Sequence, residues 1–205
     1  MTSPTDFHPE SDLLRMAIKP PWTSSVSPHC ECRYDSENHV LHIAGPANCH
    51  ALVEFPFQVP RIYALEAEAL CGRNTGNAWG PGIALCWPGG RVLRVNVRAD
   101  GRYGVDDGRR TTISGSTPEQ GWTALRLRLT PGEVLAEAAA QPGLWAVLAA
   151  FPRDLYPGDP CAARLGKMSR WCTAKDHHNL GAQGDSAIRN PALSYGAARL
   201  SPRAP

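Results

Sequence analysis

Two glutamates, Glu66 and Glu68, stand two residues apart in the segment Arg61 to Cys71. On a strand their carboxylates point to the same side, about 6–7 Å apart along the chain. Paired carboxylates of this kind can act as acid and nucleophile in glycoside hydrolysis. Carboxylates next to guanidinium groups also suit sugar hydroxyls or acidic sugars. We therefore consider two functions for this pair: glycoside hydrolysis or lysis, and carbohydrate binding without catalysis.

Other polar and aromatic residues occupy alternate positions in neighbouring segments. We expect these residues to share one face of one sheet with the two glutamates: Arg94, Asn96, Arg98, Trp122, Arg126 and Arg128. Trp79 lies in a loop rich in Gly and Asn, where an exposed indole could stack on a ligand. The plainer alternative is a solvated outer face on which opposite charges neutralise one another across strands.

Two groups of residues suggest metal binding. The first lies within 22 residues: His29, Cys30, Cys32, His39, His42, Cys49 and His50. Its Cys-x-Cys spacing is not that of structural zinc sites, and it has no matching second pair. The second group, Asp100, Asp106 and Asp107, suggests calcium, but Asp-Gly pairs already serve as hairpin turns. We therefore expect no metal and no cofactor, with calcium as the alternative.

The candidate residues have to be positioned by strands. Between Trp79 and Thr130, apolar and polar residues alternate and are interrupted by Gly-Gly and Asp-Gly turns, which predicts antiparallel strands joined by hairpins. The alternation assigns one set of residues to the core: Ile83, Leu85, Trp87, Leu93, Val95, Val97, Leu125, Leu127 and Leu129. By the same alternation Trp145, Val147 and Phe151 share a core face, and we assign no function to Trp87 or Trp145.

The rest of the chain is divided by its proline and turn residues. Residues 1–28 are predicted to be an irregular lead-in, with a short helical turn only at Asp12 to Ile18, ahead of Pro20-Pro21. Residues 29–196 form the domain and residues 197–205 a tail. Arg61 to Cys71 is predicted as a strand, with a helix as the competing interpretation. About ten short strands predict an all-β, two-sheet antiparallel β-sandwich of jelly-roll type.

Composition limits the functions open to this chain of 205 residues. Its formal net charge of +2 is too small to indicate nucleic-acid or anionic-membrane binding. Seven cysteines, an odd number, indicate free thiols in a reducing compartment. The N-terminus has no signal-peptide pattern, which favours a cytoplasmic location, or a secreted one if the chain is truncated.

Three segments resemble the concanavalin A-like lectin and glucanase superfamily, most closely its bacterial modules related to laminin G-like domains. They are WGPGIALCWPGGRVLRVNVRADGRYGVDDG, GWTALRLRLTPGEVLAEAAAQPGLWAVL and PGDPCAARLGKMSR, and the resemblance covers roughly residues 22–196. It implies a jelly roll, a fold that hosts lectins, hydrolases and structural modules. The laminarinase-like glucanases of this superfamily carry three acids at alternate strand positions, where this chain has Glu66, Glu68 and Leu70. The missing third acid argues against hydrolysis. The polar face and Trp79 favour a non-catalytic carbohydrate- or ligand-binding module, with a glycoside hydrolase or lyase and a structural or protein-interaction domain as the alternatives.

Overall fold

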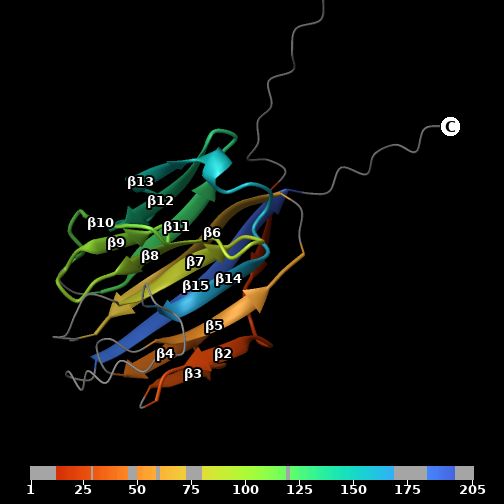
Figure 1. Cartoon of the computed structure of the whole chain (residues 1–205). Helices are drawn as coiled ribbons and strands as arrows, with labels where there is room; N and C mark the ends of the chain where they lie inside the picture. Colours follow the sequence, from red (N-terminus) through yellow and green to blue (C-terminus); the bar gives the residue numbers. More distant parts are fainter. Residues whose placement is uncertain are drawn as a thin grey trace, which may run out of the picture.

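The computed structural model describes residues 13–28, 30–45, 50–58, 61–72, 80–118, 121–168 and 184–196. These residues form two antiparallel sheets that pack face to face (Figure 1). The all-β sandwich of jelly-roll type is confirmed. The one helical element of the described chain is the 3-10 turn η1 (Arg153–Leu155), and no helix there has the length and apolarity to cross a membrane.

The strand order of each sheet mixes segments that are far apart in the sequence. The eight-stranded sheet runs β13 (Ala146–Pro152), β12 (Glu133–Ala139), β11 (Thr123–Leu129), β6 (Ile62–Cys71), β15 (Gly184–Gly196), β4 (Val40–Gly45) and β3 (Glu31–Asp35), with β1 (Leu13–Ala17) also paired to β15. The seven-stranded sheet runs β10 (Thr111–Ser114), β9 (Tyr103–Asp106), β8 (Val92–Val97), β7 (Pro81–Cys86), β14 (Ala162–Lys167), β5 (Ala51–Pro56) and β2 (Thr23–Val26). β6 and β7 follow one another in the chain but belong to different sheets.

The core lies between the two sheets and is built from the residues that the alternation assigned to it. Each of those nine residues from Ile83 to Leu129 is buried, as predicted. Trp87 packs against Tyr156 with a centroid distance of 4.6 Å, and its indole N–H donates to the carbonyl of Gly158 at 3.2 Å. Burying large apolar side chains in this way is the main stabilising contribution to such a sandwich.

The prediction of an irregular lead-in was wrong for two segments. Leu13–Ala17 pairs with β15, and Thr23–Val26 pairs with β5, so both are sheet strands. The predicted helical turn at Asp12 to Ile18 is absent from the described part of that segment, residues 13–18, because a β-strand partner is available for its backbone. Tertiary pairing outweighs the helix propensity of Leu, Arg, Met and Ala.

Register shifts change the alternation in the edge strand β13 and in the inner strand β15 of the eight-stranded sheet. Between β12 and β13, Ala136 faces Ala149 but Glu137 faces Val147, so Leu148 is an extra residue. In β15 the register shifts between Arg189 and Ala192, and Asn190 there adopts a φ of 53°. A bulge moves all later side chains to the opposite face of a strand.

Candidate functional site

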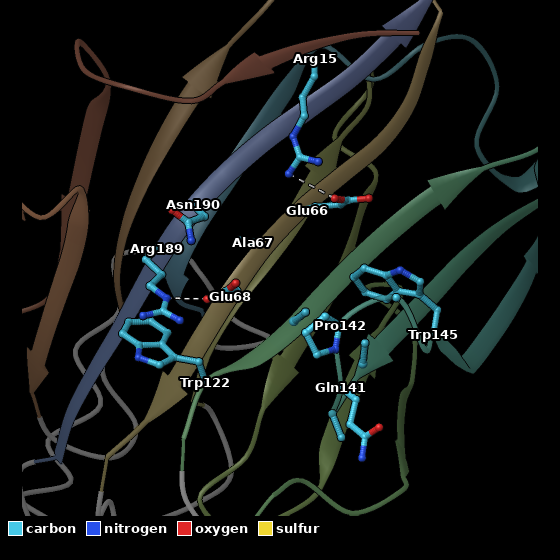
Figure 2. Close-up of a pocket in the computed structure, with 14 residues that line it drawn as sticks. Arg15, Glu66, Ala67, Glu68, Trp122, Gln141, Pro142, Trp145, Arg189 and Asn190 are labelled. Carbon is cyan, nitrogen blue, oxygen red and sulfur yellow. Dashed lines mark hydrogen bonds and ion pairs between the residues drawn. The ribbon is translucent and has the colours of Figure 1, made fainter. Parts of the chain in front are cut away.

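A groove of about 300 Å3 lies on the face of the eight-stranded sheet that points away from the core (Figure 2). It is formed by β15, β6, β11, the end of β12 and the turn between β12 and β13. The charged and aromatic residues that line it are Arg15, Glu66, Glu68, Trp122, Trp145 and Arg189. Residues 141–143 form one wall. The groove thus contains both glutamates singled out from the sequence.

The register of β6 explains why these side chains meet. Along β6, Leu65, Ala67 and Ala69 are buried in the core, so Glu66 and Glu68 project outward. On the neighbouring strands, Ala124 and Arg189 lie opposite Glu68, and Arg126 lies opposite Glu66.

The floor of the groove is made of small side chains. Ala124 of β11 lies between Glu68 on one side and Ala139 of β12 on the other. Two alanines in a row across the sheet leave a hollow that larger side chains would fill. The hollow therefore results from the small size of Ala124 in β11 and Ala139 in β12.

At one end of the groove, Trp122, Arg189 and Glu68 form a contact unit. The guanidinium carbon of Arg189 lies 4.2 Å from the centroid of the Trp122 ring, a cation–π arrangement. The Nε of Arg189 donates to Glu68, as Figure 2 shows. Arg189 is thus held on two sides and in turn fixes the orientation of the indole.

At the other end, Trp145, Arg126 and Glu137 repeat this arrangement. The guanidinium carbon of Arg126 lies 4.0 Å from the Trp145 ring centroid, and its Nε donates to Oε2 of Glu137 at 2.6 Å. Arg126 also lies 3.7 Å from Glu66, which links this unit to the centre of the groove. Figure 2 shows Trp122 and Trp145 on opposite sides of the groove.

Glu137 is the buried anchor of the second unit. Its side chain is 2% exposed and accepts bonds from Arg126 and, at 2.8 and 3.1 Å, from Arg128. Burial raises the pKa of Glu137, but the hydrogen bonds and charges of Arg128 and Arg126 lower it by more, so that the pKa lies below its ordinary value. Glu137 therefore remains ionised and holds both arginines.

The N-terminal strand also reaches the groove. Arg15 on β1 places a guanidinium nitrogen 3.4 Å from Glu66, across the edge of β15. Figure 2 shows this side chain pointing down toward Glu66. Each of the three glutamates in this cluster thus has at least one arginine partner.

The expectation that all the polar candidates share one face of one sheet was wrong for Arg94, Asn96 and Arg98. Arg94 and Asn96 lie on β8 and Arg98 directly after it, in the seven-stranded sheet, whereas Glu66, Glu68, Arg126 and Arg128 lie on β6 and β11. Alternation places a residue on one side of its strand, but it does not say which sheet the strand joins. All three misplaced residues are buried.

The residues at β8 have structural partners of their own. Arg94 forms an ion pair with Asp106 at 3.0 Å, with side chains 7% and 0% exposed. The amide of Asn96 donates to the carbonyl of Val97 at 3.3 Å. Arg98 donates to Asp100. Burial raises the pKa of Asp100, but bonds from Arg98 and Arg102 outweigh this and lower it to about 2.

The residues considered for metal binding are engaged in other contacts. Asp106 accepts from the backbone of Gly108 and from Thr111, each at 2.7 Å, and Asp107 accepts from two backbone N–H groups in its turn. Among the described residues, no three His, Cys, Asp or Glu side chains come together to hold a metal ion. Trp79 lies outside the described residues.

The described members of the His/Cys cluster lie in different parts of the sandwich. His50 precedes β5 and bonds to Ser25 at 3.1 Å and Ser27 at 2.7 Å. Cys32 lies on β3 of the other sheet, where burial raises the pKa of its thiol to about 11. His29 and Cys49 lie outside the described residues.

Four residues of the site were not predicted from the sequence: Arg15, Trp145, Arg189 and Glu137. Trp145 and Val147 were assigned to the core with Phe151, which was wrong for the first two, since the extra residue Leu148 reverses the alternation between them and Phe151. Arg189 precedes the bulge of β15. Glu137 could have been found from the sequence. A tight Pro-Gly turn joins β11 to β12 and fixes their register, and this register places Glu137 opposite Arg126.

Comparisons with known proteins support the fold. No family model and no curated protein matches the sequence. Among solved structures, the Crh5 transglycosylase is similar with a TM-score of 0.57 and 13% identity, over 91% of this chain and 85% of that one. A pseudo β-1,3-glucanase of Mycobacterium tuberculosis is similar with a TM-score of 0.52 and 13% identity, over 78% and 76%.

A lectin domain shares the same architecture. The exoplasmic/lumenal domain of VIP36, in its Ca2+- and mannose-bound form, is similar with a TM-score of 0.53 and 11% identity, over 90% of this chain and 86% of that one. At these identities the similarity establishes the arrangement of strands. The chain has the concanavalin A-like lectin and glucanase fold.

Proposed function

We propose that this protein is a carbohydrate-binding module without catalytic activity, and that the groove on the eight-stranded sheet holds a neutral saccharide. The observation that carries the proposal is the groove between Trp122 and Trp145, lined by Glu66 and Glu68 in ion pairs with arginines. Aromatic rings stack on the apolar face of a pyranose ring, and carboxylate and guanidinium groups form hydrogen bonds with its hydroxyl groups.

The charge balance of the groove favours a neutral ligand. The cluster contains four arginines and three glutamates, and every one of them has a partner of opposite sign: Arg15, Arg126, Arg128, Arg189, Glu66, Glu68 and Glu137. An ionic ligand would have to displace one of these partners. A hydroxyl group can instead donate to a carboxylate and accept from a guanidinium without breaking the pair.

Proteins with the same fold bind neutral sugars. The Crh5 transglycosylase has been solved with NAG, and the VIP36 domain with mannose. These ligands and the β-1,3-glucan named for the mycobacterial protein suggest three probes for this chain: chitotetraose, mannotetraose and laminaritetraose.

The test is a calorimetric titration of the protein with each of the three oligosaccharides at up to millimolar concentration. At least one is expected to bind, and Glu68→Gln or Trp122→Ala is expected to weaken binding by about 10-fold or more, since each removes a charge-assisted hydrogen bond or a stacking surface.

A matched ion pair on the other sheet provides the control. Glu54 accepts from Arg164 at 2.6 Å on the outer face of the seven-stranded sheet, with exposures close to those of Glu68 and Arg189. Glu54→Gln is expected to leave binding unchanged. Absence of binding to all three probes would overturn the proposal, as would equal losses in Glu54→Gln and Glu68→Gln.

A second candidate function is cleavage of glycosidic bonds by Glu66 and Glu68, either by hydrolysis or by a lyase reaction. The observation in its favour is that both carboxylates lie in the groove on neighbouring outward positions of one strand. The observation against it is that both are in ion pairs, whereas a general acid must carry a proton to donate. Product formation from the same probes that is lost in the Glu66→Gln/Glu68→Gln double variant would establish this function in place of the first.

A further inference from the structure

The two ends of the groove carry the same kind of contact unit. Each consists of an indole, a guanidinium stacked on it at 4.0–4.2 Å and a glutamate that binds the guanidinium. One unit is Trp122 with Arg189, and the other is Trp145 with Arg126. The alanine floor lies between them. A site for a single sugar ring would need only one such platform.

We infer that the ligand is a linear oligosaccharide that lies diagonally across the strands and stacks on both indoles, rather than a single terminal sugar. This inference rests on the proposed function of the groove. It adds the class of ligand, a chain, and the direction in which the chain runs, from the β11 end at Trp122 to the β13 end at Trp145.

The separation of the two indoles follows from the sheet register. Trp122 precedes Thr123 and lies two residues before Ala124 on β11. Trp145 precedes Ala146 on β13, two strands away from β11, and Ala146 faces Ala138 of the intervening strand β12. Two strand spacings and two residue steps place the two Cα atoms about 12 Å apart. One pyranose ring is too short to cover both platforms, and a chain of linked rings is not.

Each indole keeps some exposed surface beside its stacked arginine. Arg189 covers one face of Trp122, and the ring is still only half-buried. The same holds for Arg126 and Trp145. Because Glu68 and Glu137 fix the two guanidinium groups, the indoles are oriented before the ligand arrives, which reduces the entropic cost of binding. The two arginines are therefore positioning residues.

The middle of the diagonal suits the central part of a chain. Ala124 and Ala139 leave room above the sheet, and Glu68 lies at the same level, where its carboxylate can accept from sugar hydroxyls. Residues 141–143 bound the groove on the side of the turn. Across the sheet, the charged position of Glu68 on β6 is thus followed by the small positions on β11 and β12 and then by Trp145 at the start of β13.

The experiment compares chain lengths. Glucose, laminaribiose, laminaritriose and laminaritetraose are titrated into the protein, with the corresponding N-acetylglucosamine and mannose series in parallel. In the series that binds, affinity is expected to rise at least 10-fold between the monosaccharide and the trisaccharide. Trp145→Ala is expected to abolish most of that rise, so that the monosaccharide and trisaccharide affinities of the variant lie within about 2-fold of one another, whereas Glu54→Gln on the other sheet keeps the full rise.

The outcomes separate the two proposals. If the monosaccharide binds as tightly as the tetrasaccharide, the chain inference is overturned while carbohydrate binding stands. If no member of any series binds, both are overturned. Arg126→Lys provides a second variant in case Trp145→Ala unfolds: it keeps the charge but loses the planar stack, and it is expected to reduce the length dependence while the unfolding midpoint stays near that of the wild type.

Discussion

The outer faces of the two sheets carry the same kinds of charged side chain in opposite surroundings. On the eight-stranded sheet, Glu68 and Arg189 form an ion pair with about a third of each side chain exposed, beside a groove. On the seven-stranded sheet, Arg94 and Asp106 form an ion pair that water scarcely reaches. The alternation that places these residues outward is equally strict in both sheets. An outward position therefore does not establish that a charge is available to a ligand.

The contrast assigns different tasks to the two faces. Glu66, Glu68 and Arg189 at the groove are stabilised by partners but remain partly exposed, so that their main contribution is to recognition, whereas Glu137 beside them is buried. Charges at β8 are desolvated, and each depends on its partner because an unpaired buried charge is costly. We make four predictions, of which the first compares the two faces directly and the other three concern the face that carries the groove.

The largest effect is expected for Arg94→Met. The substitution leaves the Asp106 carboxylate buried without its guanidinium, which is expected to lower the free energy of unfolding by about 3–5 kcal/mol. Arg189→Met, at the groove, is expected to cost less than about 1 kcal/mol because its pair with Glu68 is partly exposed. Urea unfolding of the two variants measures the difference, and equal losses would contradict the contrast.

The next largest effect is expected for Glu137→Gln. This substitution removes the carboxylate that holds Arg126 and Arg128, and the expected loss is about 2 kcal/mol in the free energy of unfolding. Glu68→Gln is the reference, with an expected loss below about 1 kcal/mol. Thermal or urea unfolding at pH 7 measures both losses. A larger loss of unfolding free energy in Glu68→Gln than in Glu137→Gln would contradict this prediction.

A pH titration sharpens the account of Glu137. Because its pKa is lower in the folded protein than the ordinary 4.5, it contributes stability above that pH, and this stability is lost as the pH falls through the lowered value. The difference in stability between wild type and Glu137→Gln is therefore expected to narrow below about pH 4.5. A difference that stays constant down to about pH 3 would show that Glu137 is not stabilised by its charge.

The smallest effect on stability is expected for Ala124→Leu. The side chain points out of the core, so the free energy of unfolding should change by less than about 1 kcal/mol. The larger side chain fills the groove floor between Glu68 and Ala139, and binding of the oligosaccharide probes should fall at least 10-fold. Unfolding and calorimetry on the same sample measure the two effects separately. An unchanged affinity would show that the ligand does not bind over Ala124.

The sequence predicted the fold well because its signals are local. Alternation between Ile83 and Leu129 identified the core residues, and the Gly-Gly and Asp-Gly turns identified the hairpins. The N-terminal strands were missed because Leu13–Ala17 acquires its β structure from β15, a partner about 180 residues away in the chain.

The candidate site was predicted only in part, for two physical reasons. Glu66, Glu68, Trp122 and Arg126 were placed on the correct face because alternation within one strand and pairing across one sheet decide their positions. Arg94 was misplaced because the choice of sheet depends on long-range packing. Trp145 was missed because a single extra residue in β13 reverses the alternation, and nothing in the local pattern marks it.

The central claim is that carbohydrate binds in the groove between Trp122 and Trp145, and the indole N–H resonances of the tryptophans test it most directly. The chain has six tryptophans, of which Trp22 and Trp87 serve as internal references away from the groove. During titration with the oligosaccharide that binds best, the account predicts that the resonances of Trp122 and Trp145 shift together and saturably while the reference signals stay in place. Saturable shifts at any other tryptophan, Trp79 included, with Trp122 and Trp145 unmoved, would contradict it.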